Sequence, residues 1–355
     1  MSLTVLSIAF PFAPVGPFGV GGAEQVLSEL DTALVAAGQR SLVAACAGSL
    51  VAGELFPAPM PERPLVNESD RHWYRWRFQA AIDLALARHS VDLIHMHGMD
   101  FDEHVLPPGI PALVTLHAPL TRYRPEVWAC HTGTAHFQCV SETQRLSCPE
   151  AFGSVPVVAN GVPLPDNDIH RRREEFAVAI GRVCPEKNVH EALEAGTSAG
   201  MRVLVGGHLF PFQEHGEYFR RCIEPLLGHD GVKHAYLGPL DANRRRRLLA
   251  RARCLLQPTL APEVSSLVAM EALAAGTPVI AYRSGALTEI VEDGVTGFLV
   301  DSVAEMAEAI RNIDQISHEA CRAAAEQRFS RDRMVRDYFD LYGALLTGNQ
   351  QRMYA

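Results

Sequence analysis

The sequence predicts an α/β protein made of two doubly wound domains and a C-terminal helix. The chain has 355 residues, which is too long for one comfortable hydrophobic core and suits two domains. Short apolar runs bounded by Gly and Pro alternate with helical patterns, as in parallel sheets covered on both faces. Around residues 157–175 the alternation breaks into Asn, Gly, Pro and charged residues and then restarts. This break predicts a domain boundary.

The first half contains a strand, a glycine-rich loop and then a helix. The helical face of residues 23–38 is formed by Val26, Leu27, Leu30, Leu34 and Val35, and Gly38 is a stop signal. We predict the strands of this half at residues 3–10, 41–46, 91–98, 111–119 and 137–142.

The second half repeats the architecture without repeating a motif. We predict strands at 176–181, 202–207, 232–238 and 253–259, with helices near 188–196, 214–226 and 241–251. Residues 329–346 carry apolar side chains at helical spacing and form an amphipathic helix that must pack against something. We therefore divide the chain into domains 1–165 and 166–328 and a helical tail 329–355.

Composition excludes several classes of protein. Hydrophobic residues make up 48% and charged residues 21%, and the net charge of −9 provides no basic footprint for nucleic acid. The N-terminal apolar run lacks a basic flank and a cleavage site, so we expect a buried strand and not a signal peptide. No run approaches 18 apolar residues, so we expect no transmembrane segment.

Eight cysteines without a framework spacing predict reduced thiols in a cytoplasmic protein. Cys130, Cys139 and Cys148 lie nine residues apart, with His131 and His136 between the first two, which raises the question of a metal site. Zinc sites usually bring two ligands within two to four residues of each other, and this segment lacks such a pair. We therefore expect no bound metal there.

Two loops are candidates for binding an anion. Residues 15–25 place four glycines between a strand and a helix, where backbone N–H groups can receive a phosphate. The loop is too long for a dinucleotide fingerprint, and the second strand lacks the expected acidic end. Arg182 and Lys187 follow the first strand of the second half. They lie at its carboxyl end, where open α/β sheets bind ligands, and could clamp a diphosphate. Flexible or solvated loops are the alternatives at both places.

A nearly uncharged apolar run carries two carboxylates, Glu263 and Glu271. Ser265 or Ser266 is a natural N-cap for a helix that ends at Gly276. The N-terminus of that helix would lie between the two carboxylates, where its N–H groups favour a phosphate with hydroxyl-binding groups on either side. A sugar joined through a diphosphate to a nucleoside has this layout. The alternative is a solvated Glu263 and a buried Glu271, which would need a partner.

These motifs, in this order, resemble the retaining glycosyltransferases of family 4, typified by glycogen- and sucrose-synthase-like enzymes. The two glutamates are separated by seven residues, and the chain continues EALAAGTPVIAYRSGALTEIVEDGVTGFLV. GVGGAEQ, NGV and GRVCPEKN resemble further family motifs. The resemblance covers most of the chain. It implies the GT-B fold, in which two Rossmann-like domains face each other across a cleft and a C-terminal helix crosses back to the N-terminal domain.

The resemblance also implies roles in binding a donor. Arg182 and Lys187 would hold the diphosphate, together with the start of the helix near Leu267. Glu271 would accept hydrogen bonds from the ribose hydroxyls, and Glu263 from hydroxyls of the transferred sugar.

Further positions match the family around the sugar, the acceptor and the base. Gly21 and Gly22 would approach the phosphate and the acceptor, and His117 would lie near the sugar. Gly238 and Leu240 fall where the family often lines the base pocket.

One departure concerns the sugar pocket. The family commonly has Pro-Phe-Gly after the first glutamate, whereas this chain has Val264, Ser265 and Ser266. We expect Ser265 and Ser266 to contact the substrate, with a donor specificity of their own.

The resulting expectation is a metal-independent retaining glycosyltransferase without a cofactor. It would move a sugar from a nucleoside-diphosphate sugar to a hydroxyl of a small-molecule, saccharide or lipid-linked acceptor. An epimerase or hydrolase on the same scaffold, and a non-catalytic binding subunit, are the alternatives.

Three further motifs keep two interpretations each. His95 and His97 either act at a pocket at the strand end, as acceptor contacts or metal ligands, or pack in the core. HWYRWR at 72–77 either docks a lipid head group or aromatic acceptor or packs one face of a helix. RRRR at 244–247 either touches an anionic membrane, as a peripheral contact, or forms a solvated helix face, which we favour.

Overall fold

The chain folds into two compact units. The computed structural model describes residues 2–17, 19, 21–60, 68–128, 135–150, 155–165, 173–228 and 232–348. Unit 1 comprises Met1–Ala159 together with Met334–Ala355, and unit 2 comprises Asn160–Arg333. The structure thus divides the chain after residues 159 and 333, while our sequence-based division fell after residues 165 and 328.

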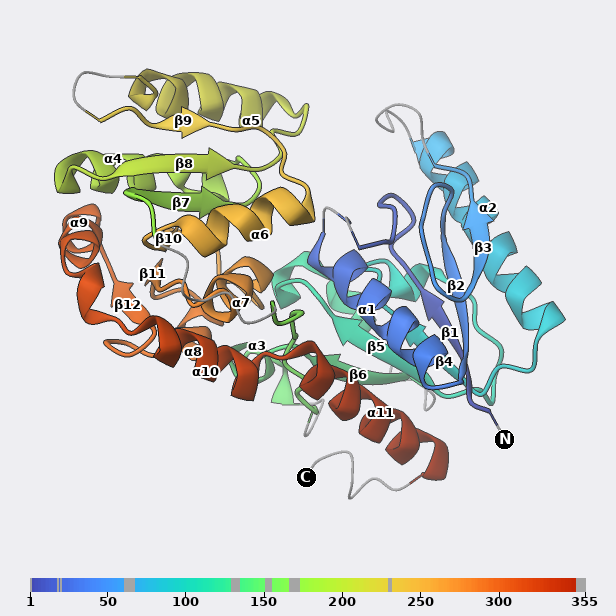
Figure 1. Cartoon of the computed structure of the whole chain (residues 1–355). Coiled ribbons are helices and arrows are strands. Elements are labelled where there is room, and N and C mark those ends of the chain that lie inside the picture. The colour runs from blue at the N-terminus through green and yellow to red at the C-terminus, as the bar shows by residue number, and fades with distance from the viewer. Residues whose placement is uncertain are drawn as a thin grey trace. The chain divides into compact units, whose positions relative to one another are not determined.

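Unit 1 is built on a six-stranded parallel sheet with the strand order β3-β2-β1-β4-β5-β6 (Figure 1). Its strands are β1 (Thr4–Ile8), β2 (Arg40–Cys46), β3 (Glu54–Ala58), β4 (Leu93–Met96), β5 (Ala112–Leu116) and β6 (Ala135–Cys139). Helices α1 (Gly22–Ala36), α2 (Glu68–Arg88), α3 (Glu142–Leu146) and α11 (Arg331–Thr347) accompany it.

The two faces of this sheet bury different helices. Leu6 and Ile8 of β1 pack in one cluster with Phe78 and Ile82 of α2. Val5 points to the opposite face, in a cluster with residues of α1 and with Met334, Tyr338, Leu341 and Tyr342 of α11. Side chains alternate between the faces of a strand, so this short apolar run serves both layers. Of the apolar face predicted over residues 329–346, Met334, Tyr338, Leu341 and Leu345 are buried in unit 1, whereas Phe329 is buried in the core of unit 2 and Leu346 is 43% exposed.

The edge strand β3 was not predicted from the sequence. Its five residues, ELFPA, include Pro57, which cannot donate a ladder hydrogen bond and is typical of edge strands. Phe56 is 2% exposed and anchors the strand in the core. The remaining strands of unit 1 lie where the apolar runs predicted them.

Unit 2 repeats the architecture with the order β12-β11-β10-β7-β8-β9 (Figure 1). Its strands are β7 (Phe176–Ile180), β8 (Arg202–Gly206), β9 (Ala235–Tyr236), β10 (Leu255–Gln257), β11 (Val279–Tyr282) and β12 (Gly297–Val300). Its α-helices are α4 (Val189–Ala199), α5 (Gln213–Tyr218), α6 (Ala242–Arg251), α7 (Leu267–Ala274), α8 (Leu287–Ile290), α9 (Val303–Arg311) and α10 (His318–Arg328). All pairings in both sheets are parallel.

The helix predicted near 214–226 is irregular. After the six residues of α5, the chain forms a π-helical turn at Phe219–Ile223 and a 3-10 turn at Glu224–Leu226. Pro225 cannot continue an α-helical hydrogen-bond ladder, so the segment changes its winding before it reaches the proline.

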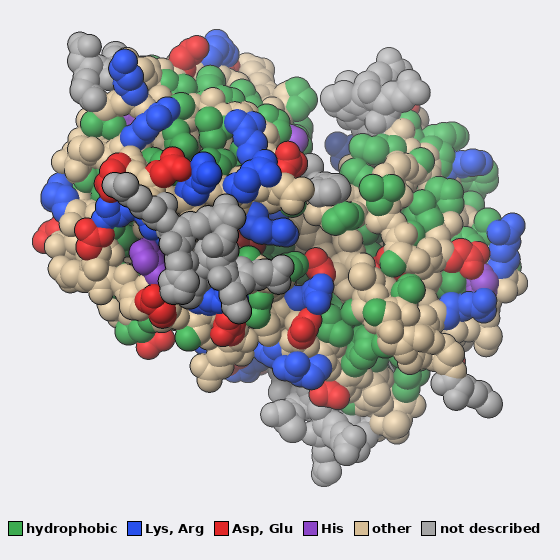
Figure 2. All heavy atoms as spheres, in the orientation of Figure 1, with side chains coloured by type: hydrophobic (Ala, Val, Ile, Leu, Met, Phe, Trp, Pro, Cys, Tyr) green, Lys and Arg blue, Asp and Glu red, His purple; other side chains and the backbone are tan. Residues whose placement is uncertain are grey.

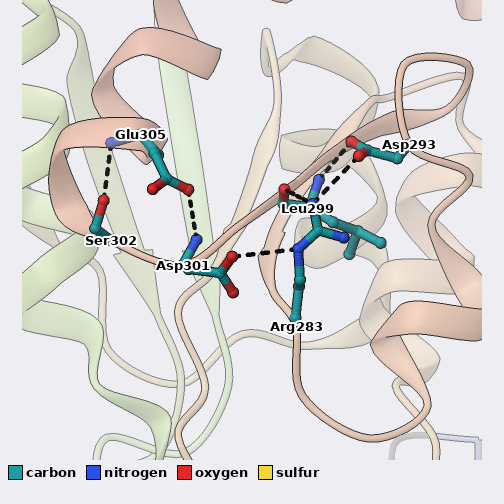
Figure 3. Close-up of polar contacts among 6 residues, drawn as sticks. All are labelled: Arg283, Asp293, Leu299, Asp301, Ser302 and Glu305. Atoms are coloured by element: carbon teal, nitrogen blue, oxygen red, sulfur yellow. Dashed lines mark hydrogen bonds and ion pairs between the residues drawn. The ribbon is translucent and has the colours of Figure 1, made fainter.

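Polar side chains fix the end of the sheet in unit 2 (Figure 3). Arg283, after β11, reaches Asp293, Asp301 and the carbonyl of Leu299. Ser302 accepts a hydrogen bond from the N–H of Glu305 at 3.2 Å, while the Glu305 carboxylate accepts one from the N–H of Asp301 at 2.9 Å. This reciprocal capping satisfies N–H groups at the start of α9.

The described surface mixes charges of both signs. On the face drawn in Figure 2, Lys and Arg side chains are interspersed with Asp and Glu side chains. Among the described helices, none is long and apolar enough to cross a membrane.

Candidate active site

In each sheet, the chain first adds strands on one side of its first strand and then returns to add strands on the other side. We call the place between the first strand and the returning strand the reversal point. In unit 2, β7 is followed outward by β8 and β9, and the chain then returns to place β10 on the other side of β7. Open α/β sheets bind ligands beyond the carboxyl ends of the strands at such a point. The loops that follow β7 and β10 contain Arg182, Lys187 and Glu263, so this point in unit 2 is the candidate donor site.

Lys187 and Glu263 meet at this point. The Nζ atom of Lys187 forms an ion pair with Oε1 of Glu263, and both side chains are largely buried. Lys187 ends the short 3-10 turn Pro185–Lys187, whose N-terminal flank is Cys184. The side chain of Arg182 is exposed and pairs with no residue that the structure describes. A lysine fixed by a carboxylate and a neighbouring unpaired guanidinium are suited to hold an anion.

Backbone contacts fix the loop that carries Glu263. The N–H of Leu260 donates to the carbonyl of Glu186 at 3.0 Å, which joins the two loops. The carbonyl of Glu263 accepts a hydrogen bond from the N–H of Ala286 at 2.7 Å. Gly285 has a φ of +53°, and a Cβ atom there would lie 2.1 Å from the Glu263 carbonyl oxygen. Only glycine therefore allows this close approach.

The two serines that depart from the family pattern make structural hydrogen bonds. Ser265 accepts one from Nδ2 of Asn160 at 3.0 Å, which ties the NGV segment to the loop. Ser266 occupies the N-cap position of α7, but its hydroxyl lies 3.4 Å from Gln257 and does not cap the helix. The first N–H groups of α7, at Leu267 and Val268, have no intrahelical partner and are available to an anion.

Glu271 is paired with an arginine that the sequence analysis placed on a solvated face. Nε and an Nη atom of Arg245 each lie 2.7 Å from a different oxygen of Glu271. This bidentate pair supplies the partner that a half-buried carboxylate needs. A carboxylate has about four lone-pair positions, so Glu271 keeps acceptor capacity for hydroxyl groups. Arg244, Arg246 and Arg247 of the same helix are exposed, as expected for a solvated face.

Gly238 and Leu240 lie beside the end of β8. The carbonyl of Gly238 accepts a hydrogen bond from the N–H of Gly207 at 2.9 Å. A Cβ atom on Gly206 would lie 2.2 Å from a methyl carbon of Leu240. The segment therefore lines the sheet end next to the loop of Arg182.

The glycine loop of unit 1 leads into α1 at the corresponding reversal point, between β1 and β4. Gly21 is the N-cap of α1 and Gly22 its first residue. A Cβ atom on Gly21 would lie 1.9 Å from a carboxylate oxygen of Glu24, which folds over the start of the helix. Burial raises the pKa of Glu24, and a hydrogen bond from its own backbone lowers it in part. Glu24 was not among the predicted site residues.

A buried polar network supports the strand ends of unit 1. Thr115 donates to Oε1 of Gln138 at 2.7 Å, so its oxygen accepts from Nε2 of His95 at 2.8 Å. His95 therefore carries its proton on Nε2, and Nδ1 accepts from the hydroxyl of Tyr342 at 2.7 Å. Tyr338 donates to the same Gln138 oxygen at 3.1 Å. His95 is thus a satisfied core residue that attaches α11 to the sheet.

His97 and His117 form a stacked pair at the reversal point. Nδ1 of His97 lies 3.0 Å from Nε2 of His117, and the rings are 5.2 Å apart. Burial lowers the pKa of His117 to about 3 and that of His97 well below its ordinary value. Both rings are therefore neutral at pH 7, and one donates the shared proton to the other. A neutral His117 can orient a hydroxyl but does not act as a cation.

The structure brings together part of the predicted site. Lys187 meets Glu263, and Ser265 and Ser266 adjoin them, whereas Glu271 pairs with Arg245. Arg245 and Asn160 were not predicted as site residues, and only the requirement of a partner for Glu271 pointed to the arginine. Cys130 and His131 lie outside the described residues. Cys139 and Cys148 place their sulfur atoms 3.6 Å apart.

The comparisons with known proteins agree with this fold. A model described as "Glycosyltransferase Family 4" matches residues 20–165, and one described as "Glycosyl transferases group 1" matches residues 166–331. Solved structures share the fold: sucrose-phosphate synthase from Thermosynechococcus elongatus has a TM-score of 0.76 at 19% identity, covering 98% of this chain and 100% of its own. Anabaena HepE in complex with UDP and glucose has a TM-score of 0.71 at 19% identity, with 96% and 100% covered.

Curated relatives match part of the chain. A glycogen synthase of Mycobacterium tuberculosis is 28% identical over 225 residues, 58% of this chain and 52% of the relative. A D-inositol 3-phosphate glycosyltransferase of a Nocardioides species is 32% identical over 150 residues, 39% of this chain and 32% of the relative. The matched segment thus spans about half, or less, of these relatives' length. Fold and family models together define a protein of the GT-B class. The chain belongs to glycosyltransferase family 4.

Proposed function

We propose that this chain is a retaining glycosyltransferase that moves a sugar from a nucleoside-diphosphate sugar to an acceptor hydroxyl. The observation that carries the proposal is the pairing of Lys187 with Glu263 at the β7/β10 reversal point, beside the unpaired Arg182. HepE, a neighbour in fold, has been solved with UDP and glucose, which supports a donor of this chemical class.

The reaction requires stabilisation of the negative charge that develops on the leaving diphosphate. The bond between the anomeric carbon and a phosphate oxygen breaks, and the acceptor oxygen forms a new bond on the same face of the sugar. The acceptor proton passes to the leaving diphosphate. Lys187, Arg182 and the first N–H groups of α7 would stabilise the negative charge that develops there. These groups supply the stabilisation without a metal ion, so we propose a metal-independent reaction.

The two carboxylates would orient the rest of the donor. Glu263 holds Lys187 and keeps acceptor positions for hydroxyls of the sugar, and Glu271 does the same beside Arg245 for the ribose. Gly238 and Leu240 are proposed to line the base pocket. In unit 1, Gly21, Gly22 and the neutral His117 are proposed to contact the acceptor and the sugar. The acceptor is a small-molecule, saccharide or lipid-linked hydroxyl, and we expect a cytoplasmic reaction from the cysteine content.

A donor panel tests this proposal. Thermal unfolding is measured with nucleoside diphosphates and nucleotide sugars of several bases and sugars, each well above its expected dissociation constant. One base should raise the melting temperature by a few degrees, because a ligand that binds the native state stabilises it. The product formed with that donor is then analysed by NMR. Retention of the anomeric configuration supports the proposal, whereas an inverted product or release of free sugar alone contradicts it.

A further inference from the structure

Three potential metal ligands converge at the loop that carries Lys187. One ligand atom each from Cys184, Glu186 and His215 lies within 4.8 Å of the other two. Among the described residues, it is the one group of three or more His, Cys, Asp or Glu side chains close enough together to hold an ion. Cys184 and Glu186 flank Pro185 in the loop after β7, and His215 lies on α5, after β8.

Two of the three side chains, those of Cys184 and His215, are buried. Cys184 is fully buried and its thiol is free of any disulfide. The thiol donates a weak hydrogen bond to the carbonyl oxygen of Arg182, with the sulfur 3.8 Å from that oxygen, and the Glu186 carboxylate lies nearby. His215 is 7% exposed, and its Nδ1 atom has no hydrogen-bond partner among the residues that the structure describes. A buried ring nitrogen without a partner is unfavourable, and a metal ion would satisfy it.

We propose that Cys184, Glu186 and His215 bind a zinc ion. A thiolate, a carboxylate and an imidazole are all zinc ligands, and thiolate excludes the hard ions Mg²⁺ and Ca²⁺. Zinc bonds of about 2.0–2.3 Å place tetrahedral ligand atoms about 3.5 Å apart, so closure around the ion requires shifts of about 1 Å. Cys184 and Glu186 come from one loop, with a single residue between them, and His215 comes from helix α5.

Binding exchanges a proton for the ion. A thiol has an ordinary pKa of about 8.5, so Cys184 without a metal ion is mostly protonated at pH 7. Zinc coordination displaces the thiol proton to solvent, and a water molecule completes the four ligands. No electron is transferred.

The ion would act on the loop and not on the transferred sugar. Glu186 directly precedes Lys187 and Cys184 lies three residues before it, and the Lys187 side chain forms its ion pair with Glu263. Cross-linking this loop to α5 would fix the segment from which Lys187 extends. The proposed transfer step does not pass through the ion, and metal binding can be measured without a donor.

Cobalt titration of the full chain provides the test. The reduced, metal-free protein is titrated with Co²⁺, whose thiolate complexes give a near-ultraviolet charge-transfer band, and then with Zn²⁺, which should displace the cobalt and abolish the band. We expect one equivalent of Co²⁺ to saturate the band, with release of about one proton per ion at pH 7.

Variants locate the site. Cys184→Ser should lose the band, and His215→Gln should weaken Co²⁺ binding at least about tenfold. Cys222→Ser, a half-buried thiol on the segment after α5 that lies outside the group, should bind cobalt like the parent protein. Melting temperatures without metal confirm that each variant is folded. Absence of a band in the parent protein, or an unchanged band in a folded Cys184→Ser, would overturn the proposal.

Discussion

At the scale of single residues, the candidate donor site consists of charged side chains that keep hydrogen-bonding positions open for a ligand. Lys187 and Arg245 each neutralise one glutamate, while Arg182 remains unpaired among the described residues. These groups leave one net positive charge at the strand ends. The ammonium of Lys187 has three donors and each glutamate has further lone pairs, so the ion pairs can stay formed while a ligand binds. An anionic ligand rich in hydroxyl groups fits this arrangement.

Replacing Lys187 by alanine should mainly lower turnover. The charge that Lys187 stabilises grows as the diphosphate leaves, so its loss is felt most in the transition state. We expect kcat to fall about 10²- to 10³-fold with a much smaller change in KM. Steady-state kinetics with the best donor measure this, and Lys233→Ala, an exposed lysine of the same unit, is the control. Equal kcat values in the two variants would remove Lys187 from the mechanism.

The histidines of unit 1 predict a loss of stability in acid. His95, His97 and His117 have lowered pKa values because they are buried, so they are neutral when folded and protonated in the unfolded chain below about pH 6.5. The unfolded state then binds more protons, and the free energy of unfolding falls as pH falls. The slope is about 1.4 kcal/mol per pH unit for each group, and for His117 it persists down to its folded pKa of about 3.

Urea unfolding between pH 7 and pH 5 checks this dependence. His117→Asn should flatten the pH dependence by up to one proton. His72→Gln, which removes an exposed histidine of α2, should leave it as in the parent protein. A His117→Asn curve parallel to the parent curve would show that this ring is not buried in its neutral form.

The sequence did not predict which residues pair with Glu271 and Ser265. The apolar surroundings of Glu271 required a partner, yet four consecutive arginines at 244–247 gave no sign of which one would turn inward. The rotation of α6 against α7 selects Arg245, and this rotation depends on packing between segments 26 residues apart. Likewise, Ser265 departs from the family pattern, and its bond to Asn160 spans 105 residues.

At the scale of elements, the position of Glu263 depends on a neighbouring turn. Gly285→Ala should disturb this loop, because the added Cβ atom collides with the Glu263 backbone in addition to the strain of a positive φ. Gly294→Ala is the matched control: its φ is +77°, but nothing lies within 4 Å of the added atom.

Donor titration and thermal unfolding separate the two glycine variants. Both should lose about 1 kcal/mol of stability from backbone strain. Gly285→Ala should in addition bind the donor at least about tenfold more weakly, while Gly294→Ala binds it normally. Equal donor affinity would mean that the turn does not position Glu263.

The apolar runs of the sequence were sufficient to predict most strands, since strands buried on both faces are continuous apolar runs with Gly or Pro at their boundaries. They missed β3, because five residues with a proline have too little pattern, and they also missed the four-residue strand β12. The two-residue strand β9 lies inside a longer predicted strand. The break in α5 was missed because helical spacing continues through it, and only Pro225 signalled a change.

At the scale of the whole molecule, each unit places its candidate residues at one reversal point of its sheet. Lys187 and Glu263 lie there in unit 2, and the glycine loop and His97 lie there in unit 1. The sequence predicted only that Arg182 and Lys187 follow the carboxyl end of a strand. The strand order, in which a returning strand brings two loops together, comes from the structure. The fold alone leaves the base, the sugar and the acceptor open, since these depend on side chains lining the pockets.

The central claim is that Glu271 and its neighbours bind a nucleoside-diphosphate sugar. It is tested most directly by the dissociation constant of the nucleoside diphosphate selected in the donor panel, measured by calorimetry for Glu271→Ala and for the control Arg246→Ala, an exposed arginine of the same unit. Loss of hydrogen bonds to a charged group costs about 1.5–3 kcal/mol, so Glu271→Ala should bind at least about tenfold more weakly. Arg246→Ala should bind like the parent protein. A folded Glu271→Ala with parental affinity would contradict the account.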